Sequence, residues 1–110
     1  MYMNPGPEKQ PKWVPHTDVF VNDAGLTVLI ELAGIRKEDL ELTVEGGRLR
    51  IRGDRPHPYP GNHAATTHRV REIEFGNFET VIEVPQDYEI KKAKVSYAHG
   101  FFRIEVPKQL

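Results

Sequence analysis

The side chains best suited to chemistry in this sequence are five histidines and a single serine. His57, His63 and His68 lie near one another in the sequence, and imidazole nitrogens are common metal ligands. Their spacing matches no compact ligand motif and no cysteine assists, so exposed loop histidines are a simpler interpretation than a metal held by a flexible loop. Ser96 follows no sharp turn of the kind that presents a catalytic serine. We therefore predict that the chain is not an enzyme and uses no cofactor or metal.

The overall composition fits one small domain with balanced charge. A chain of 110 residues is long enough to form a single stable core without disulfides or a bound metal. Its formal net charge of −1 gives no field that would attract nucleic acid or an anionic membrane. No stretch approaches the ~18 apolar residues of a membrane-spanning helix, and none follows the first methionine as in a secretory signal. The absence of cysteine agrees with a cytoplasmic protein, and we expect neither nucleic acid nor membrane as a partner.

The elements that must position any site are strands, and the clearest of them form a hairpin near the end of the chain. Residues 94–98 and 101–106 both alternate apolar and polar side chains, which is typical of strands with one buried face. His99 and Gly100 supply the turn between them. Pro107 closes the second strand because proline has no N–H for the ladder.

Alternation also predicts strands in the middle of the chain. Residues 26–32 and 78–84 alternate, and Leu29 lies off phase and is expected to be partly exposed. The Gly-Gly pair at 46–47 permits the positive φ angles of a tight hairpin. Residues 36–39 are too short for more than one helical turn. The count of about seven or eight strands with essentially no helix indicates an all-β sandwich, with immunoglobulin-like and barrel topologies both open.

Charged residues of opposite sign form rows on the two strands that flank this Gly-Gly pair. Such rows predict cross-strand pairs on a solvated face, each worth roughly 0.2–1 kcal/mol, in preference to a site for a polyanion. The residues are Glu41 and Glu45 on one strand and Arg48, Arg50 and Arg52 on the other.

Three further stretches do not fit a simple sheet. The first fifteen residues contain four prolines, and Trp13 among them either anchors this arm on the domain or contacts a partner. The run Val19-Phe20-Val21 is apolar on both faces and needs cover on both sides. Prolines at alternate positions make residues 53–67 an excursion from the sheets. The charged segment that follows, up to Phe75, has β character with broken phase, as in an edge or exchanged strand.

Four motifs, in the same order and spacing, resemble those of the α-crystallin domain of small heat-shock proteins. The closing signature is an Ala, five residues, Asn-Gly-Val-Leu, alternating apolar residues and a Pro, with His99 here in place of Asn and Phe101-Phe102 in place of Val-Leu. The others are Leu-Pro-Gly-Val-x-Lys-Glu-Asp-Ile, with Ala33 in place of Pro, then Leu-x-Ile-x-Gly-Glu-Arg and Gly-x-Phe. The matching residues are 93–107, 32–40, 49–55 and 76–78.

The resemblance is to the bacterial and plant type, in which a long loop carries an exchanged strand. It implies the immunoglobulin-like β-sandwich of an α-crystallin domain at 15–108, after an extended or disordered arm at 1–14 and before a residual tail at 109–110. It also implies an ATP-independent holdase that binds partly unfolded proteins and prevents their aggregation.

In that family the strand in the long loop pairs with the first sheet strand of a neighbouring subunit. In this sequence the donated strand would be 68–75 and the acceptor 18–22, which predicts a homodimer with reciprocal strand exchange. An ordinary hairpin within one subunit is the alternative. Because the arm is short and no Ile-x-Ile segment follows Pro107, we expect a dimer and not a multi-subunit cage. The expected interface residues are Val19, Phe20, Val21, His68, Arg69, Val70, Arg71 and Ile73.

The family also has a groove between two strands that receives an Ile-x-Ile segment from another subunit. The resemblance implies that this client or tail groove is lined by Leu42, Val44, Val95 and Tyr97, for which plain core packing is the alternative. Two other functions stay open. One is a CS-domain-like co-chaperone adaptor, and the other is a structural β-sandwich without chaperone activity.

Overall fold

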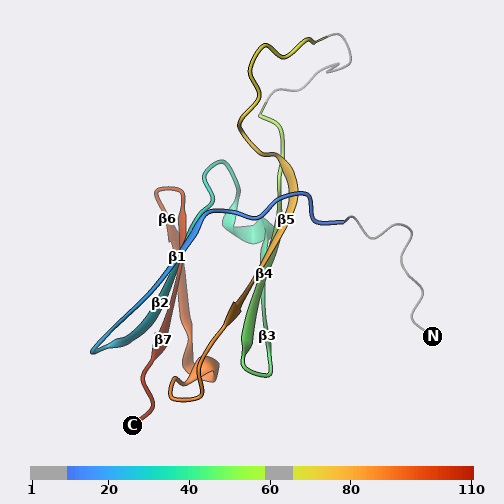
Figure 1. Ribbon diagram of the computed structural model, residues 1–110. Helices are drawn as coiled ribbons and strands as arrows, with labels where there is room; N and C mark the ends of the chain where they lie inside the picture. Colours follow the sequence, from blue (N-terminus) through green and yellow to red (C-terminus); the bar gives the residue numbers. More distant parts are fainter. Residues whose placement is uncertain (1–9, 59–65) are drawn as a thin grey trace, which may run out of the picture.

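Two antiparallel sheets packed face to face make up the fold (Figure 1). The computed structural model describes residues 10–58 and 66–110, so residues 1–9 of the predicted arm and His63 lie outside the described residues. One sheet has the strand order β1-β2-β7-β6 and the other the order β3-β4-β5. The all-β sandwich prediction is thereby confirmed. The strands are β1 (Thr17–Asn22), β2 (Gly25–Glu31), β3 (Leu40–Glu45), β4 (Arg48–Arg55), β5 (Gly76–Glu83), β6 (Lys94–Ala98) and β7 (Phe101–Pro107).

The two central strands of the four-stranded sheet supply half of the core. Val28 of β2 lies opposite Ile104 of β7, and Ile30 lies opposite Phe102. All four side chains are buried because they share the face that looks toward the other sheet. Leu29 points the other way and is half-buried, as its phase in the sequence predicts.

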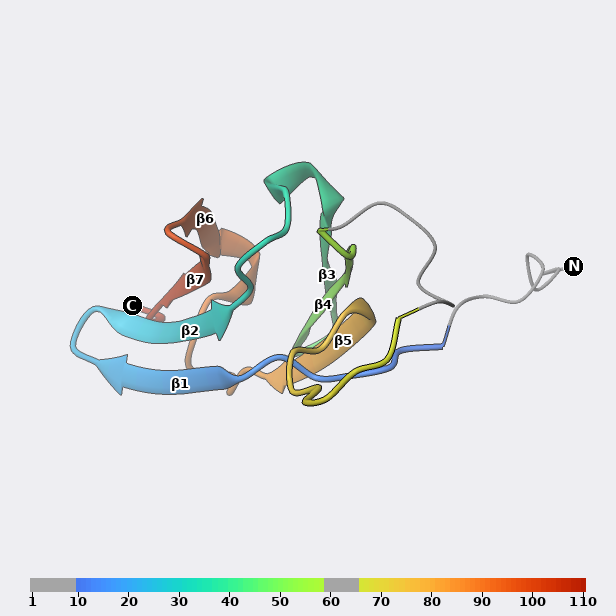
Figure 2. The same cartoon turned by 90° about the horizontal axis from the view of Figure 1, so that it is seen from above.

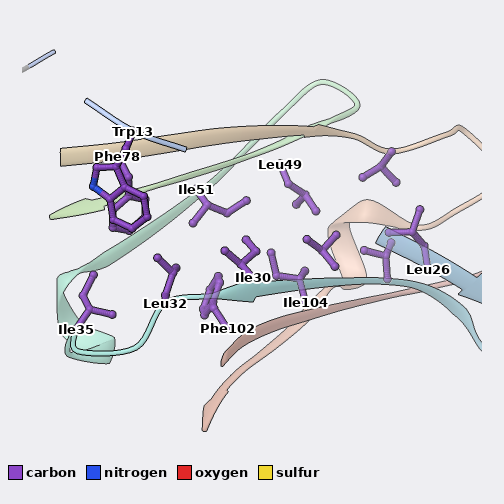
Figure 3. Close-up of a cluster of buried hydrophobic side chains, with 13 residues drawn as sticks. Trp13, Leu26, Ile30, Leu32, Ile35, Leu49, Ile51, Phe78, Phe102 and Ile104 are labelled. Carbon is purple, nitrogen blue, oxygen red and sulfur yellow. The ribbon is translucent and has the colours of Figure 1, made fainter. Parts of the chain in front are cut away.

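The three-stranded sheet supplies the other half from β4 and β5. Leu49 and Ile51 of β4 are fully buried, and Figure 3 shows them facing the side chains of the four-stranded sheet. Phe78 of β5 lies opposite Gly53, where an added Cβ would stand 2.5 Å from the Phe78 ring. The ring therefore fits because position 53 carries no side chain. The buried cluster comprises Trp13, Leu26, Val28, Ile30, Leu32, Ile35, Leu49, Ile51, Phe78, Val84, Phe102, Ile104 and Val106.

The hairpin between β6 and β7 is built as predicted and is fastened at its tip. His99 has φ 56° and Gly100 has φ 84°, two successive left-handed residues that match the twist of the flanking strands. The Leu32 amide donates to the Gly100 carbonyl at 2.7 Å, and the Tyr97 hydroxyl donates to the Leu32 carbonyl at 2.5 Å. These bonds tie the turn to the end of β2.

The connections are short except for the one between β4 and β5. The predicted helical turn near residue 37 is confirmed as the 3₁₀ turn η1 (Lys37–Asp39), and a second turn, η3 (Ile90–Lys92), precedes β6. β4 runs to Arg55, so the chain leaves the sheet three residues later than the predicted excursion at 53–67. Within the described residues, no helix is long and apolar enough to cross a membrane.

Candidate interaction edges

β1 is an end strand of its sheet and carries the three apolar residues predicted to need cover. Val19 lies opposite Val28 and therefore shares the inward-facing side of the sheet with Val21, whereas Phe20 points outward. The exposed fractions of Val19, Phe20 and Val21 are between 42% and 59%. In the described part of the chain β1 pairs on one side alone, with β2. An end strand with bare backbone groups and exposed valines is ready to pair with another chain.

The segment His68–Phe75, predicted as an edge or exchanged strand, forms no strand within one chain. Figure 1 shows it rising away from the two sheets, beyond the end of β5 where the chain returns. Val70 and Ile73 are exposed to 73% and 65%. The ordinary hairpin within one subunit is not formed, because no ladder among the described residues joins this segment to a sheet. His68, Arg69 and Arg71 are exposed as well.

The predicted groove residues lie on the two end strands at the other side of the sandwich. Figure 2 shows β3 and β6 on one side of the molecule, with β1 and β5 on the opposite side. Leu42 and Val44 of β3 face inward with Ile51 and Leu49, and Val95 and Tyr97 of β6 face inward with Ile104 and Phe102. Leu42 and Tyr97 are half-buried, and Val44 and Val95 are each 43% exposed. Plain core packing therefore does not describe the two valines.

The outward face of the three-stranded sheet carries the predicted rows of opposite charge. The two rows lie on adjacent strands, with Glu41 opposite Arg52 and Glu45 opposite Arg48. Sequence reasoning missed two carboxylates on β5, Glu79 and Glu83, which lie on this same outward face. Their positions between the inward-facing residues of a predicted strand could have placed them on the outward face. The ion pairs are Arg48–Glu83 (2.8 Å), Arg50–Glu45 (3.2 Å), Arg50–Glu79 (3.0 Å) and Arg52–Glu79 (3.5 Å).

Another ion pair lies in the η1 turn, away from the sheet faces. The Arg36 Nε atom donates to the Asp39 carboxylate at 3.1 Å. This hydrogen bond and the negative charge of Asp39 raise the pKa of Arg36 above its ordinary value, so the side chain stays cationic. The pair is exposed, and such pairs contribute little to stability.

Trp13 anchors the arm on the sandwich, the first of the two roles considered for it. Its ring lies 5.2 Å from the Phe78 ring, and its Nε1 atom donates to the Gly76 carbonyl at 3.0 Å. The Lys12 amide donates to the Asn77 carbonyl at 2.8 Å, so the arm pairs in parallel with the start of β5. Figure 3 shows Trp13 beside Phe78 at one end of the core, and the planes of the two rings are tilted by 55°.

The histidines do not assemble into a cluster in the described part of the chain. The His57 ring stacks on Phe75 at 4.3 Å, and His68 is exposed. In residues 10–58 and 66–110, no group of three histidine or acidic side chains is placed to hold a metal ion.

Comparison with known proteins gives the family. The sequence model of the Hsp20/alpha crystallin family matches residues 18–110. Heat shock protein 16 of Schizosaccharomyces pombe is 26% identical over 94 residues, which are 86% of this chain and 66% of that protein. Small heat shock protein C2 of Rickettsia felis is 24% identical over 96 residues, which are 87% of this chain and 61% of that protein. The chain thus spans between 61% and 66% of the length of these two relatives.

The solved structures agree with the sequence comparison. A small heat-shock protein from Xylella fastidiosa superposes with a TM-score of 0.77 at 25% identity, over 89% of this chain and 88% of that one. The adaptor and the purely structural sandwich are not favoured by these matches. Because the family match covers the sandwich from β1 to the end of the chain, the chain belongs to the Hsp20/alpha crystallin family of small heat-shock proteins, which is not a family of enzymes.

Proposed function

We propose that this chain is a holdase, which binds partly unfolded proteins without ATP and keeps them from aggregating. The observation that carries the proposal is that both sheets end in strands with exposed inward-facing valines, Val19 and Val21 on β1, Val44 on β3 and Val95 on β6. An unfolded chain exposes apolar side chains and unpaired backbone groups, and a sheet margin offers partners for both. Binding of the unfolded chain lowers its free concentration, and aggregation slows by mass action.

We further propose that the working unit is a homodimer formed by reciprocal strand exchange. β1 has an unpaired margin in the described chain, and the segment His68–Phe75 has no backbone partner there. Pairing of this segment with β1 of a second copy would satisfy both sets of backbone groups. Because residues three apart in a strand point to opposite faces, one of Val70 and Ile73 would lie beside Val19 and Val21, and the other would lie on the outward face with Phe20.

The client or tail groove is proposed along β3 and β6, away from the exchanged strand. Leu42, Val44, Val95 and Tyr97 face inward on two end strands that lie on the side of the sandwich opposite β1. This separation supports simultaneous use of the two margins, one for the partner subunit and one for an unfolded client.

Light scattering by a heat-labile enzyme tests the holdase proposal. The wild-type chain is expected to suppress scattering at equimolar ratio. Val44→Glu and Val95→Glu are expected to weaken protection by up to about tenfold each, the effect of losing part of one valine's apolar contact. Val81→Glu is the matched control, because Val81 is 42% exposed but lies on the outward face of β5. Scattering that is unchanged by wild type at molar excess would refute holdase activity and leave the fold untouched.

A further inference from the structure

Arg55 stands where the loop between β4 and β5 leaves the sheet and returns to it. It is the last residue of β4 and lies opposite Gly76, the first residue of β5. Its Nε atom donates to the Glu74 carbonyl at 2.8 Å, and its guanidinium donates through a second nitrogen to the Ala33 carbonyl at 3.2 Å. Both acceptors are backbone carbonyls, so one side chain fixes the main chain of the returning loop to the connection after β2.

Two aromatic rings also contact Arg55, and we call these contacts and the two carbonyl bonds together the Arg55 clasp. The guanidinium carbon of Arg55 lies 4.4 Å from the centroid of the Trp13 ring and 5.7 Å from that of Phe75. Both distances are within the range of cation–π attraction. Phe75 also stacks on His57, which lies on the part of the same loop that leaves β4. Arg55 of β4 and His57 therefore both hold the returning end of the loop, and Trp13 of the arm contacts Arg55.

We infer that Arg55 is a positioning residue for the exchanged segment; the inference rests on the proposed strand exchange. Glu74, whose carbonyl Arg55 holds, directly follows Ile73, which with Val70 carries the exposed apolar side chains of the segment. Arg55 thus sets the direction in which these side chains leave their own protomer before the second copy arrives. It acts through the main chain of Glu74 and the ring of Phe75.

Ordering of the exchanged segment before the chains meet should speed their association. Ordering the backbone of one residue costs an amount that corresponds to about tenfold in an equilibrium constant, and here that cost is met in the folded monomer and not on docking. A reciprocal dimer has two exchanged segments, so loss of the Arg55 clasp in both chains should raise the dissociation constant of the dimer about tenfold per segment, up to about a hundredfold. Most of the change should be in the association rate, because the contacts that His68–Ile73 makes with β1 of the second copy (the seam of the dimer) are unchanged.

The test compares Arg55→Met, Arg55→Lys and the control Arg36→Met. Arg36 pairs with Asp39 in an exposed turn away from the loop, so its loss should leave dimerisation within about twofold of wild type. Sedimentation gives the dissociation constant, and stopped-flow mixing of labelled subunits gives the association rate, both at a temperature where circular dichroism shows every variant fully folded. Arg55→Met should show the full loss. Arg55→Lys should lie between it and wild type, because an ammonium keeps the charge but lacks the planar fork.

The outcomes separate this inference from the proposal beneath it. A dimeric wild type with Arg55→Met at the same dissociation constant and association rate would overturn the positioning role and leave the exchange intact. A wild type that stays monomeric at every concentration would remove the exchange itself, and the inference with it. If Arg55→Met does not fold, Arg55→Lys decides, because association as fast as that of wild type would show that the planar guanidinium is not needed and would overturn the positioning role assigned to it.

Discussion

At the scale of single residues, the turn at Gly100 disfavours a side chain, both by its backbone conformation and by a close approach to Ala33. Its φ of 84° lies in the left-handed region, and an added Cβ would stand 3.1 Å from the Cβ of Ala33. Gly100→Val should therefore lower the free energy of unfolding by about 2–3 kcal/mol, from backbone strain and from the contact with Ala33. Urea unfolding followed by circular dichroism measures the change.

Gly46→Val separates the two causes. Gly46 has φ 61° in the β3–β4 turn, but no atom lies within 4 Å of an added Cβ. This variant should show the strain alone, about 1–2 kcal/mol. Equal losses at the two positions would mean that the approach to Ala33 contributes nothing, and no loss at Gly100 would contradict the positive φ angle.

Single residues also show which structural features could be predicted from the sequence and which could not. The half-exposure of Leu29 was predictable because the direction of a side chain in a strand follows from its phase alone. The pairing of Arg50 with Glu79 was not, because it depends on the register between β4 and β5, which a loop of twenty residues separates. Local pattern fixes direction, but register across a long loop depends on non-local packing.

At the scale of elements, the arm before β1 belongs to the core and joins the two sheets. Trp13 packs on Phe78 of the three-stranded sheet, and three residues later the His16 carbonyl accepts from Glu31 of the four-stranded sheet at 3.0 Å. Trp13→Ala should lower the free energy of unfolding by about 3–5 kcal/mol, the usual cost of removing a large buried aromatic side chain.

Urea unfolding followed by circular dichroism at two wavelengths checks this loss, with Val14→Ala as the control. Val14 is exposed next to Trp13, so its truncation should change stability by no more than about 0.5 kcal/mol. A Trp13→Ala variant as stable as wild type would show that the arm is not needed to close the sandwich.

The elements differ in how far sequence alone determined them. The hairpins around 46–47 and 99–100 were predictable because turn chemistry and alternation agree over adjacent residues. The same reasoning gave β character to His68–Phe75, yet a strand exists only where a second strand supplies its hydrogen bonds. That partner is absent from its own sheets among the described residues, so the propensity stays unexpressed within one chain. Trp13 was ambiguous because a lone aromatic residue among prolines has no period.

At the scale of the whole molecule, the two sides of the sandwich are assigned different tasks. The side with β1 is proposed to receive a strand of a second copy, and the side with β3 and β6 is proposed to receive clients (Figure 2). This division predicts that changes at Val44 or Val95 alter client protection without altering the oligomer, whereas changes at Val19 alter the oligomer first.

The mass of the protein in solution, measured by size-exclusion chromatography with light scattering, tests the strand-exchange dimer most directly. Wild type should have twice the 12.6 kDa mass of one chain. Val19→Asp and Val70→Asp should both be monomers, because each would bury an unpaired charge at the seam at a cost of about 3–5 kcal/mol. Val81→Asp, at a similarly exposed valine on the outward face of β5, should stay dimeric. A monomeric wild type, or seam variants that keep the mass of the dimer, would contradict the account.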